Sequence, residues 1–228
     1  MASYAVSFDG SNDDIKITDN GFDGLSTGTV EFLMKSAPVS AFQKLVFQNG
    51  CIDMGITNNG DSFGEIGGVG NLGIFGSNED DNNWHHIALT WDGSWLRGYV
   101  DGVYKSRTAQ GGNQQNLTND LYLGRRETTE PFGGLMNEFR LSNIARYTTQ
   151  TSFSVPTTKF TTDANTLILQ HLDDGSGTTA SDSSGNSNNG TLENGVSWVT
   201  PGYFPDTGGG VSDWPIFTGK KFWGPRYS

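Results

Sequence analysis

The stretch Trp84-His85-His86-Ile87-Ala88-Leu89-Thr90-Trp91-Asp92-Gly93, continued by Trp95 to Val100, Asp101-Gly102 and Val103 to Lys105, decides the fold of this chain. Its apolar side chains recur at every second position, which is the period of a β-strand. The Asp-Gly pairs tolerate the positive backbone angles of tight hairpin turns, so the stretch predicts three antiparallel strands. Because the apolar side chains occupy one face only, we expect this sheet to pack on a second sheet.

The rest of the chain predicts one large all-β domain. Its 228 residues include 32 glycines and only 17% charged residues, and short apolar runs alternate with Asn, Asp, Ser, Thr and Gly. This composition is typical of a two-sheet antiparallel β-sandwich with many turns. Further strands are expected at Tyr4–Phe8, Asp14–Ile17, Gly28–Lys35, Gln43–Gln48, Cys51–Thr57, Gly73–Phe75, Leu121–Gly124, Leu135–Leu141 and Thr166–His171. A single helical turn is expected at Asn143–Tyr147, followed by an extended connection at Thr148–Asp163.

Charge and cysteine content narrow the classes of partner. The chain has 14 basic and 25 acidic side chains, a net charge of -11, which disfavours nucleic acid and anionic lipid as partners. Cys51 is the single cysteine, so no intrachain disulfide can form. The sequence has no secretion signal and no run long enough to cross a bilayer, so we expect assembly in the cytoplasm without membrane insertion.

Three motifs together resemble a known superfamily. Phe8–Asp14, the Trp84–Gly102 meander and Gly134–Leu141 resemble the concanavalin A-like lectin/glucanase superfamily, in its laminin G-like, pentraxin-related branch. The resemblance implies a jelly roll of two curved antiparallel sheets over residues 1–200, leaving residues 201–228 as a C-terminal docking tail. The runs Ile144–Tyr147 and Phe153–Pro156 also resemble such domains in bacteriophage structural proteins.

The C-terminal part of the domain is out of the family's usual order. The segment resembling His171–Asn186 often precedes the part resembling Phe8–Gly10, whereas here it follows. Three explanations remain open: a permuted domain whose C-terminal strand returns beside the N-terminal strand, an unfinished second repeat, or donation to a neighbouring subunit. Permutation is the simplest, because it buries Leu167, Leu169 and Trp198 in the first core.

A structural calcium ion is implied by the same resemblance. Asp182, Ser184, Asn186 and Asn188 offer oxygen atoms at alternate positions, but Ser187 replaces the glycine of a helix-loop-helix calcium loop. In the family, calcium bridges the N-terminal region or this loop to an acidic residue, and Asn137, followed by Glu138, matches that position. The expected ligands are therefore Asp182, Asn186, Asn137 and Glu138. The alternative is that Asp182 and the asparagines only cap turns.

Catalytic patterns are absent from the sequence. It contains no Glu-x-Asp-x-x-Glu run of the kind that glucanases use, and the acidic run at residues 78–81 has the composition of a loop. His85 and His86 are adjacent on a strand and point to opposite faces, and Cys51 has no recognisable partner. We therefore expect no catalytic residues and no enzyme activity.

Two polar loops and one tryptophan are candidates for glycan binding, with a solvated surface as the alternative for each. The first loop carries Asn113, Gln114, Gln115 and Asn116, the second carries Arg125, Arg126, Glu127, Glu130 and Phe132, and Trp95 lies beside a turn.

The tail is rich in aromatic residues, which is unusual for a flexible linker. We expect it to dock on its own domain or on another subunit through Trp214, Phe217, Phe222, Trp223 and Tyr227. The leading hypothesis is a non-enzymatic bacteriophage virion protein, such as a capsid decoration, head-fibre or tail-associated subunit. Its partners would be other virion subunits, copies of itself and host surface glycans. The alternatives are a free carbohydrate-binding module and a glucanase-like domain that retains only the fold.

Overall fold

The computed structural model describes residues 3–126 and 129–204, and these form strands without any α-helix. The predicted docking residues Trp214, Phe217, Phe222, Trp223 and Tyr227, and also Glu127, lie outside the described residues. The strands are β1 (Ala5–Asp9), β2 (Asp14–Ile17), β3 (Gly28–Ser36), β4 (Gln43–Gln48), β5 (Ile52–Ile56), β6 (Ser62–Ile66), β7 (Gly70–Ile74), β8 (Trp84–Trp91), β9 (Trp95–Val100), β10 (Val103–Ala109), β11 (Leu121–Leu123), β12 (Gly133–Ser142), β13 (Thr166–Gln170), β14 (Thr179–Ala180), β15 (Gly190–Glu193) and β16 (Ser197–Val199).

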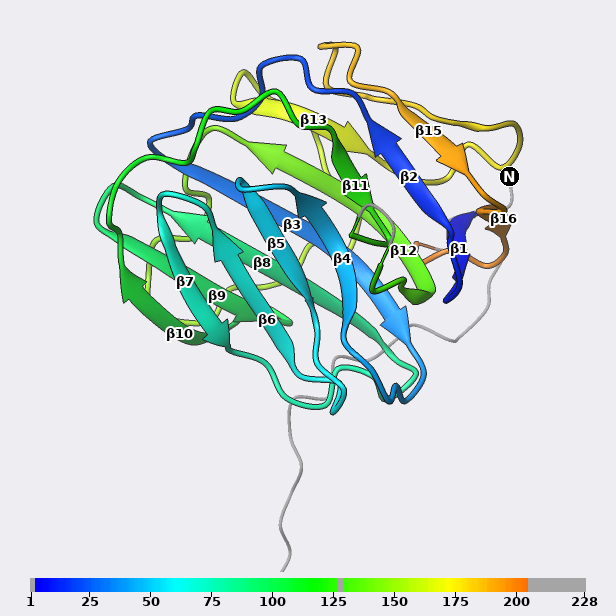
Figure 1. The fold of residues 1–228 in the computed structure, drawn as a ribbon, viewed down its shortest axis with the longest axis horizontal. Coiled ribbons are helices and arrows are strands. Elements are labelled where there is room, and N and C mark those ends of the chain that lie inside the picture. The colour runs from blue at the N-terminus through cyan, green and yellow to red at the C-terminus, as the bar shows by residue number, and fades with distance from the viewer. Residues whose placement is uncertain (1–2, 127–128, 205–228) are drawn as a thin grey trace, which may run out of the picture.

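The strands form two eight-stranded antiparallel sheets that face each other as a sandwich (Figure 1). Sheet A has the order β10-β9-β8-β3-β12-β1-β16, and β13 also pairs with β12. Sheet B has the order β14-β15-β2-β11-β4-β5-β6-β7 and lies in front of sheet A in Figure 1. The predicted two-sheet β-sandwich is confirmed.

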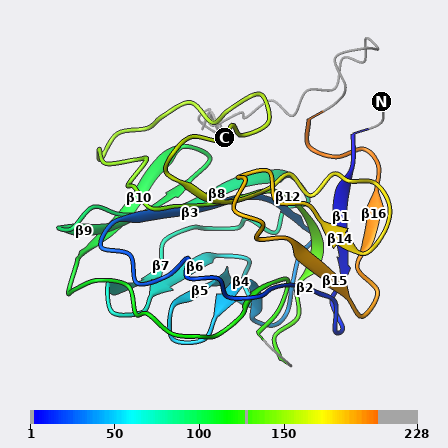
Figure 2. The ribbon, with the colours of Figure 1, turned by 90° about the horizontal axis from the view of Figure 1, so that it is seen from above.

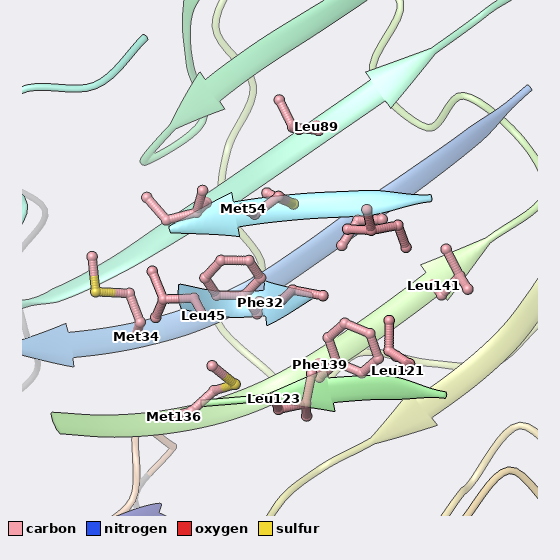
Figure 3. Packing of buried hydrophobic residues seen from close by; sticks show 14 of the residues in the cluster. Phe32, Met34, Leu45, Met54, Leu89, Leu121, Leu123, Met136, Phe139 and Leu141 are labelled. Atoms are coloured by element: carbon pink, nitrogen blue, oxygen red, sulfur yellow. The ribbon is translucent and has the colours of Figure 1, made fainter. Parts of the chain in front are cut away.

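The core lies between the sheets, where alternate side chains of each strand meet. Phe32, Met34 and Phe139 of sheet A point towards Leu45 and Met54 of sheet B (Figure 3), and all five are almost completely buried. The predicted meander contributes Ile87, Leu89 and Trp91 to this core.

Both Asp-Gly pairs of the meander form the expected turns. Asp101 and Gly102 have φ angles of 51° and 70°, and Gly93 has a φ of 89°, all in the region that favours glycine. Trp91 pairs with Leu96, and Val100 pairs with Val103, so the register is the one that two tight hairpins impose.

The C-terminal segment completes both sheets of the same domain. β15 pairs with β2 in sheet B, and β16 pairs with β1 in sheet A through Ala5 opposite Val199. Leu169 is 1% exposed, and Leu167 and Trp198 pack against the core. The C-terminal strands β15 and β16 therefore pair with the N-terminal strands β2 and β1 of the same chain, which is the arrangement expected of a permuted domain. The first residues of the predicted tail also pack on this domain, since Tyr203 and Phe204 contact Leu33 on sheet A.

The outer face of sheet A is covered by a later segment of the chain, although the apolar side chains of the meander point to the inner face as expected. The connection 143–165 lies across β3, β8 and β10 (Figure 2). Beneath it, the fully buried Glu31 carboxylate accepts hydrogen bonds from His86 Nε2 at 3.0 Å, from Tyr147 Oη at 2.7 Å and from two nitrogens of Arg140. Burial opposes ionisation of Glu31, but the His86 hydrogen bond and the Arg140 charge outweigh it and lower its pKa to about 2.

Two local predictions are wrong. Asn143–Tyr147 is not a helical turn, because its backbone groups bond to β3 instead: the Ile144 carbonyl accepts from Thr29 Oγ1, and Arg146 N donates to the same atom. The glycine-rich stretch before Phe75 holds two strands, β6 and β7, rather than the single strand expected at Gly73–Phe75. Among the described residues, no helix is long and apolar enough to span a membrane.

Candidate functional site

The outer face of sheet B carries an uninterrupted row of directly opposed residues. It contains, from one edge to the other, Thr179, Thr191, Lys16, Tyr122, Phe47, Asp53, Glu65 and Asn71. Their strand neighbours, such as Ile15, Ile17 and Leu121, point into the core, so the row points outwards. We call this surface the sheet B face. It combines aromatic rings, carboxylates and amides.

An open hollow of about 210 Å³ lies beside this row, where the β4–β5 and β6–β7 connections meet. Its rim includes Phe47, Asp53, Glu65, Gln115 and Arg126. Phe47 is only 3% exposed, and the Arg126 guanidinium lies 5.1 Å from the centre of its ring. A ligand that moves this exposed arginine side chain would reach an aromatic ring with carboxylates beside it.

Bare backbone lines another part of the hollow. A Cβ atom at Gly67 would lie 1.7 Å from the Gly50 carbonyl oxygen, and one at Gly68 would lie 2.3 Å from the Asn113 carbonyl oxygen. Only glycine allows these segments to approach so closely. The two glycines therefore preserve the shape of the hollow.

At the ends of β6 and β7 that lie away from the hollow, the strands present apolar side chains on the same side as the row. Phe63 pairs with Ile74 across β6 and β7, and the Phe42 ring lies 5.9 Å from the Phe63 ring. Phe42 is 49% exposed and Ile74 is 60% exposed. Lys44 links this end to the row, since its ammonium lies 4.4 Å from the Phe63 ring centre and 2.6 Å from Asp53 Oδ1. We call Phe42, Phe63 and Ile74 the apolar end.

The structure brings one predicted glycan-binding loop to the site only in part. Gln115 lines the hollow, and Asn113 contributes its backbone carbonyl beside Gly68. Gln114 is 3% exposed, with its Oε1 facing Leu25 N at 3.5 Å, so it holds the loop in place instead. Asn116 is exposed and packs over Gly24.

The other predicted glycan-binding residues have different surroundings. Phe132 is wrong as a ligand platform, because its ring is fully buried and packs 5.7 Å from Phe8. Arg125 pairs with the buried Asp14 at 2.9 Å, and the Arg107 guanidinium lies over the Trp95 ring at 3.8 Å. Of the second loop, Arg126 lies at the hollow and Glu130 approaches Lys44 at 3.8 Å.

The four predicted calcium ligands already have partners within the protein. Asp182 accepts hydrogen bonds from the backbone of Leu169, Ser184 and Asn188, so it caps a turn. Asn186 donates to the Thr166 and Leu167 carbonyls. This geometry favours the turn-capping alternative for the Asp182 loop.

Asn137 and Glu138 lie at a β-bulge in β12, apart from that loop. Glu138 has a φ of 53°, and the extra residue puts both side chains on the covered side of sheet A. Asn137 donates to the His171 carbonyl at 2.6 Å, and Glu138 accepts from His171 Nδ1 at 2.9 Å. No group of three or more His, Cys, Asp and Glu side chains within residues 3–126 and 129–204 is placed to hold a metal ion.

Two buried carboxylates in the N-terminal motif each have one oxygen atom without a hydrogen-bond partner. Asp13 and Asp14 are 2% and 0% exposed, and Asp13 Oδ1 and Asp14 Oδ2 have no hydrogen-bond partner. Burial raises the pKa of both groups. An unpartnered buried oxygen costs free energy that a bound cation would offset. Asp14 Oδ1 is already bound by the Arg125 guanidinium at 2.9 Å and by the Asn194 amide, so the calcium ion implied by the resemblance would be held through Asp13 Oδ1 and Asp14 Oδ2.

The residues with reactive side chains lie away from the sheet B face or are buried. His85 and His86 point to opposite faces, as expected: His85 contacts Asp81 and Asp101, and His86 contacts Glu31. Cys51 is buried, and burial together with Asp23 raises the pKa of its thiol to about 12, which disfavours a reactive thiolate.

Sequence reasoning missed most of the sheet B face. Lys44, Phe47 and Asp53 lie in predicted strands but have no predicted role, and Phe63 and Glu65 lie outside every predicted strand. The one available signal was the alternation of polar and apolar residues along Cys51–Thr57, which indicates a strand with one outward face. Which strands lie beside it is a property of the tertiary structure.

Comparisons with known proteins agree with this architecture. Among curated proteins, none matches the sequence. A solved structure from Bacteroides ovatus ATCC 8483, named "putative carbohydrate binding protein", superposes with a TM-score of 0.66 at 23% identity, over 87% of this chain and 60% of that chain. The present chain thus spans less than two thirds of that protein.

Two further solved structures match this chain at lower similarity. The SAP-like pentraxin of Limulus polyphemus has a TM-score of 0.49 at 12% identity, over 65% of this chain and 79% of that chain. Domains LG4-5 of the mouse laminin alpha1 chain have a TM-score of 0.49 at 16% identity, over 68% of this chain and 47% of that chain. A sequence profile described as the concanavalin A-like lectin/glucanases superfamily matches residues 9–152, which include strands β2 to β12. The chain therefore belongs to the concanavalin A-like lectin/glucanases superfamily.

Proposed function

We propose that this protein is a carbohydrate-binding module that holds a glycan on the sheet B face. The observation that carries the proposal is the difference in cover between the two sheets. The outer face of sheet A is buried beneath the connection 143–165, whereas the sheet B face presents a hollow rimmed by Phe47, Asp53, Glu65 and Gln115. The lectin superfamily and the name of the Bacteroides ovatus protein support the same function.

The groups around the hollow suit the two kinds of surface that a sugar has. Carboxylates accept hydrogen bonds from sugar hydroxyl groups, and amides both donate to them and accept from them. An aromatic ring packs on the apolar side of a pyranose. Asp53 and Glu65 lie directly opposite each other on β5 and β6, so both can reach one sugar ring. Asn71 holds Glu65 in place through a hydrogen bond of 2.7 Å.

We propose binding without hydrolysis, because the chain lacks the carboxylate run of glucanases. The virion role predicted from the sequence stays a prediction: the aromatic tail on which it depends lies outside the described residues. Display of a glycan-binding sandwich on a particle remains compatible with the sheet B face.

A glycan array followed by titration calorimetry tests the proposal. We expect the protein to bind at least one glycan class, and Glu65→Ala to weaken that binding by about tenfold, the effect of losing a charge-assisted hydrogen bond. Asp174→Ala is the matched control, since this exposed carboxylate lies between β13 and β14, away from the hollow. Binding that survives Glu65→Ala unchanged, or no binding to any glycan, would refute the proposed site.

A further inference from the structure

We infer that the ligand of the sheet B face is an uncharged oligosaccharide that extends from the hollow along β6 to the apolar end. This inference rests on the proposed function and adds the chemical class and the minimum size of the glycan. It depends on the balance of charges around the hollow and on the position of the exposed apolar side chains.

The charges around the hollow leave one carboxylate without a cation. Lys44 pairs with Asp53 at 2.6 Å and approaches Glu130 at 3.8 Å, and Arg126 approaches the same Glu130 at 3.8 Å. Within the described residues, Glu65 makes no ion pair, and its hydrogen-bond donor is the neutral amide of Asn71. Three carboxylates therefore face two cations, so the hollow is negative.

The whole chain adds to this local field. Its net charge is -11, and both cations near the hollow are already paired. A sugar bearing a carboxylate or a sulfate would meet repulsion from Glu65 without a free cation to offset it. A neutral sugar has no such penalty, because its hydroxyl groups donate hydrogen bonds to carboxylates.

The length of the ligand follows from the direction of β6. Phe63 and Glu65 lie on the same side of this strand, and Gly67 follows at the hollow. Glu65 on the rim lies two residues, about 7 Å, from Phe63, and Gly67 lies four residues, about 13 Å, from it, so a ligand that fills the hollow and also covers Phe63 is longer than one pyranose ring. Phe42 and Ile74 are 49% and 60% exposed, which leaves apolar surface for a second sugar.

The experiment compares matched glycans on the full-length protein. The strongest neutral oligosaccharide from the array is titrated beside an analogue in which one primary hydroxyl is oxidised to a carboxylate. We expect the carboxylated analogue to bind about tenfold more weakly at low ionic strength, and the gap to narrow with added salt. Glu65→Gln should narrow the gap at low salt, while Asp174→Asn, which removes a distant charge, should leave it nearly unchanged.

Chain length is tested with the same ligand series. We expect the oligosaccharide to bind more tightly than its monosaccharide, and the double variant Phe42→Ser/Ile74→Ser to remove most of that gain. An acidic glycan that binds as tightly as the neutral one, or a monosaccharide that binds as tightly as the oligosaccharide, overturns the inference and leaves the proposed function standing. Failure of every glycan on the array overturns both.

Discussion

The two sheets of this sandwich use polar residues on their outer faces in opposite ways. On sheet A, Glu31, His86 and Arg140 lie beneath the connection 143–165 and bond to one another away from water. On sheet B, Asp53 and Glu65 lie on an open surface beside a hollow. A charged residue on a strand is therefore structural or available for binding depending on what covers the strand.

The largest expected effect of this difference is on stability. Glu31→Ala would leave Arg140 buried without its anion and remove the acceptor of His86 and Tyr147, which should cost about 3–5 kcal/mol of unfolding free energy. Urea denaturation measures this change. If the variant does not fold, Glu31→Gln keeps the volume and should still be destabilised. A loss below about 1 kcal/mol would mean that the network behaves like an exposed ion pair.

A pH dependence of stability should come from His85, near the start of β8 in sheet A. Burial opposes protonation of His85, but the hydrogen bonds with Asp101 and Asp81 outweigh it and raise its pKa to about 9. A raised pKa means that the stabilisation is complete below the unfolded value near 6.5 and is lost as the pH rises through 9. The loss should be on the order of 3 kcal/mol. His85→Gln should remove this slope, and equal slopes for both proteins would contradict the assignment.

Calcium should have a smaller effect, at the edge where the N-terminal and C-terminal strands meet. We expect saturating calcium to raise the melting temperature of chelator-treated protein by about 2–4 °C, which corresponds to about 1 kcal/mol for a chain of this size. Asp13→Asn should remove the shift, and Asp182→Asn should preserve it. No shift with the native protein would exclude the ion, and loss of the shift with Asp182→Asn alone would favour the ligands expected from the sequence.

The smallest expected effect is on the stability of the open face. Glu65→Ala should change the unfolding free energy by no more than about 0.5 kcal/mol, because Glu65 is partly exposed and makes no ion pair among the described residues. Measured beside Glu31→Ala, this variant compares one glutamate from each outer face. A loss approaching that of Glu31→Ala would mean that the sheet B face is a structural network as well.

The sequence predicted the sandwich more accurately than the site. The alternation in Trp84–Trp91 and the Asp-Gly turns depend on neighbouring residues, and both appear in the structure as expected. The glycine-rich strands β6 and β7 were harder to recognise, because glycines interrupt the alternation on which strand prediction depends. Phe132 was misassigned for a related reason, since a loop composition does not show that one ring of the loop turns into the core.

What the sequence by itself determined is local: strands of period two, turns at Asp-Gly pairs, an acidic chain and the motifs of its superfamily. The tertiary structure alone decided which outer face stays open and which residues meet on it. Asp53 and Glu65 come together because β5 pairs with β6 in one register, and Glu31 is buried because a segment more than 100 positions later folds over it. Long-range pairing and coverage depend on the summed packing of the whole chain, so a local pattern cannot encode them.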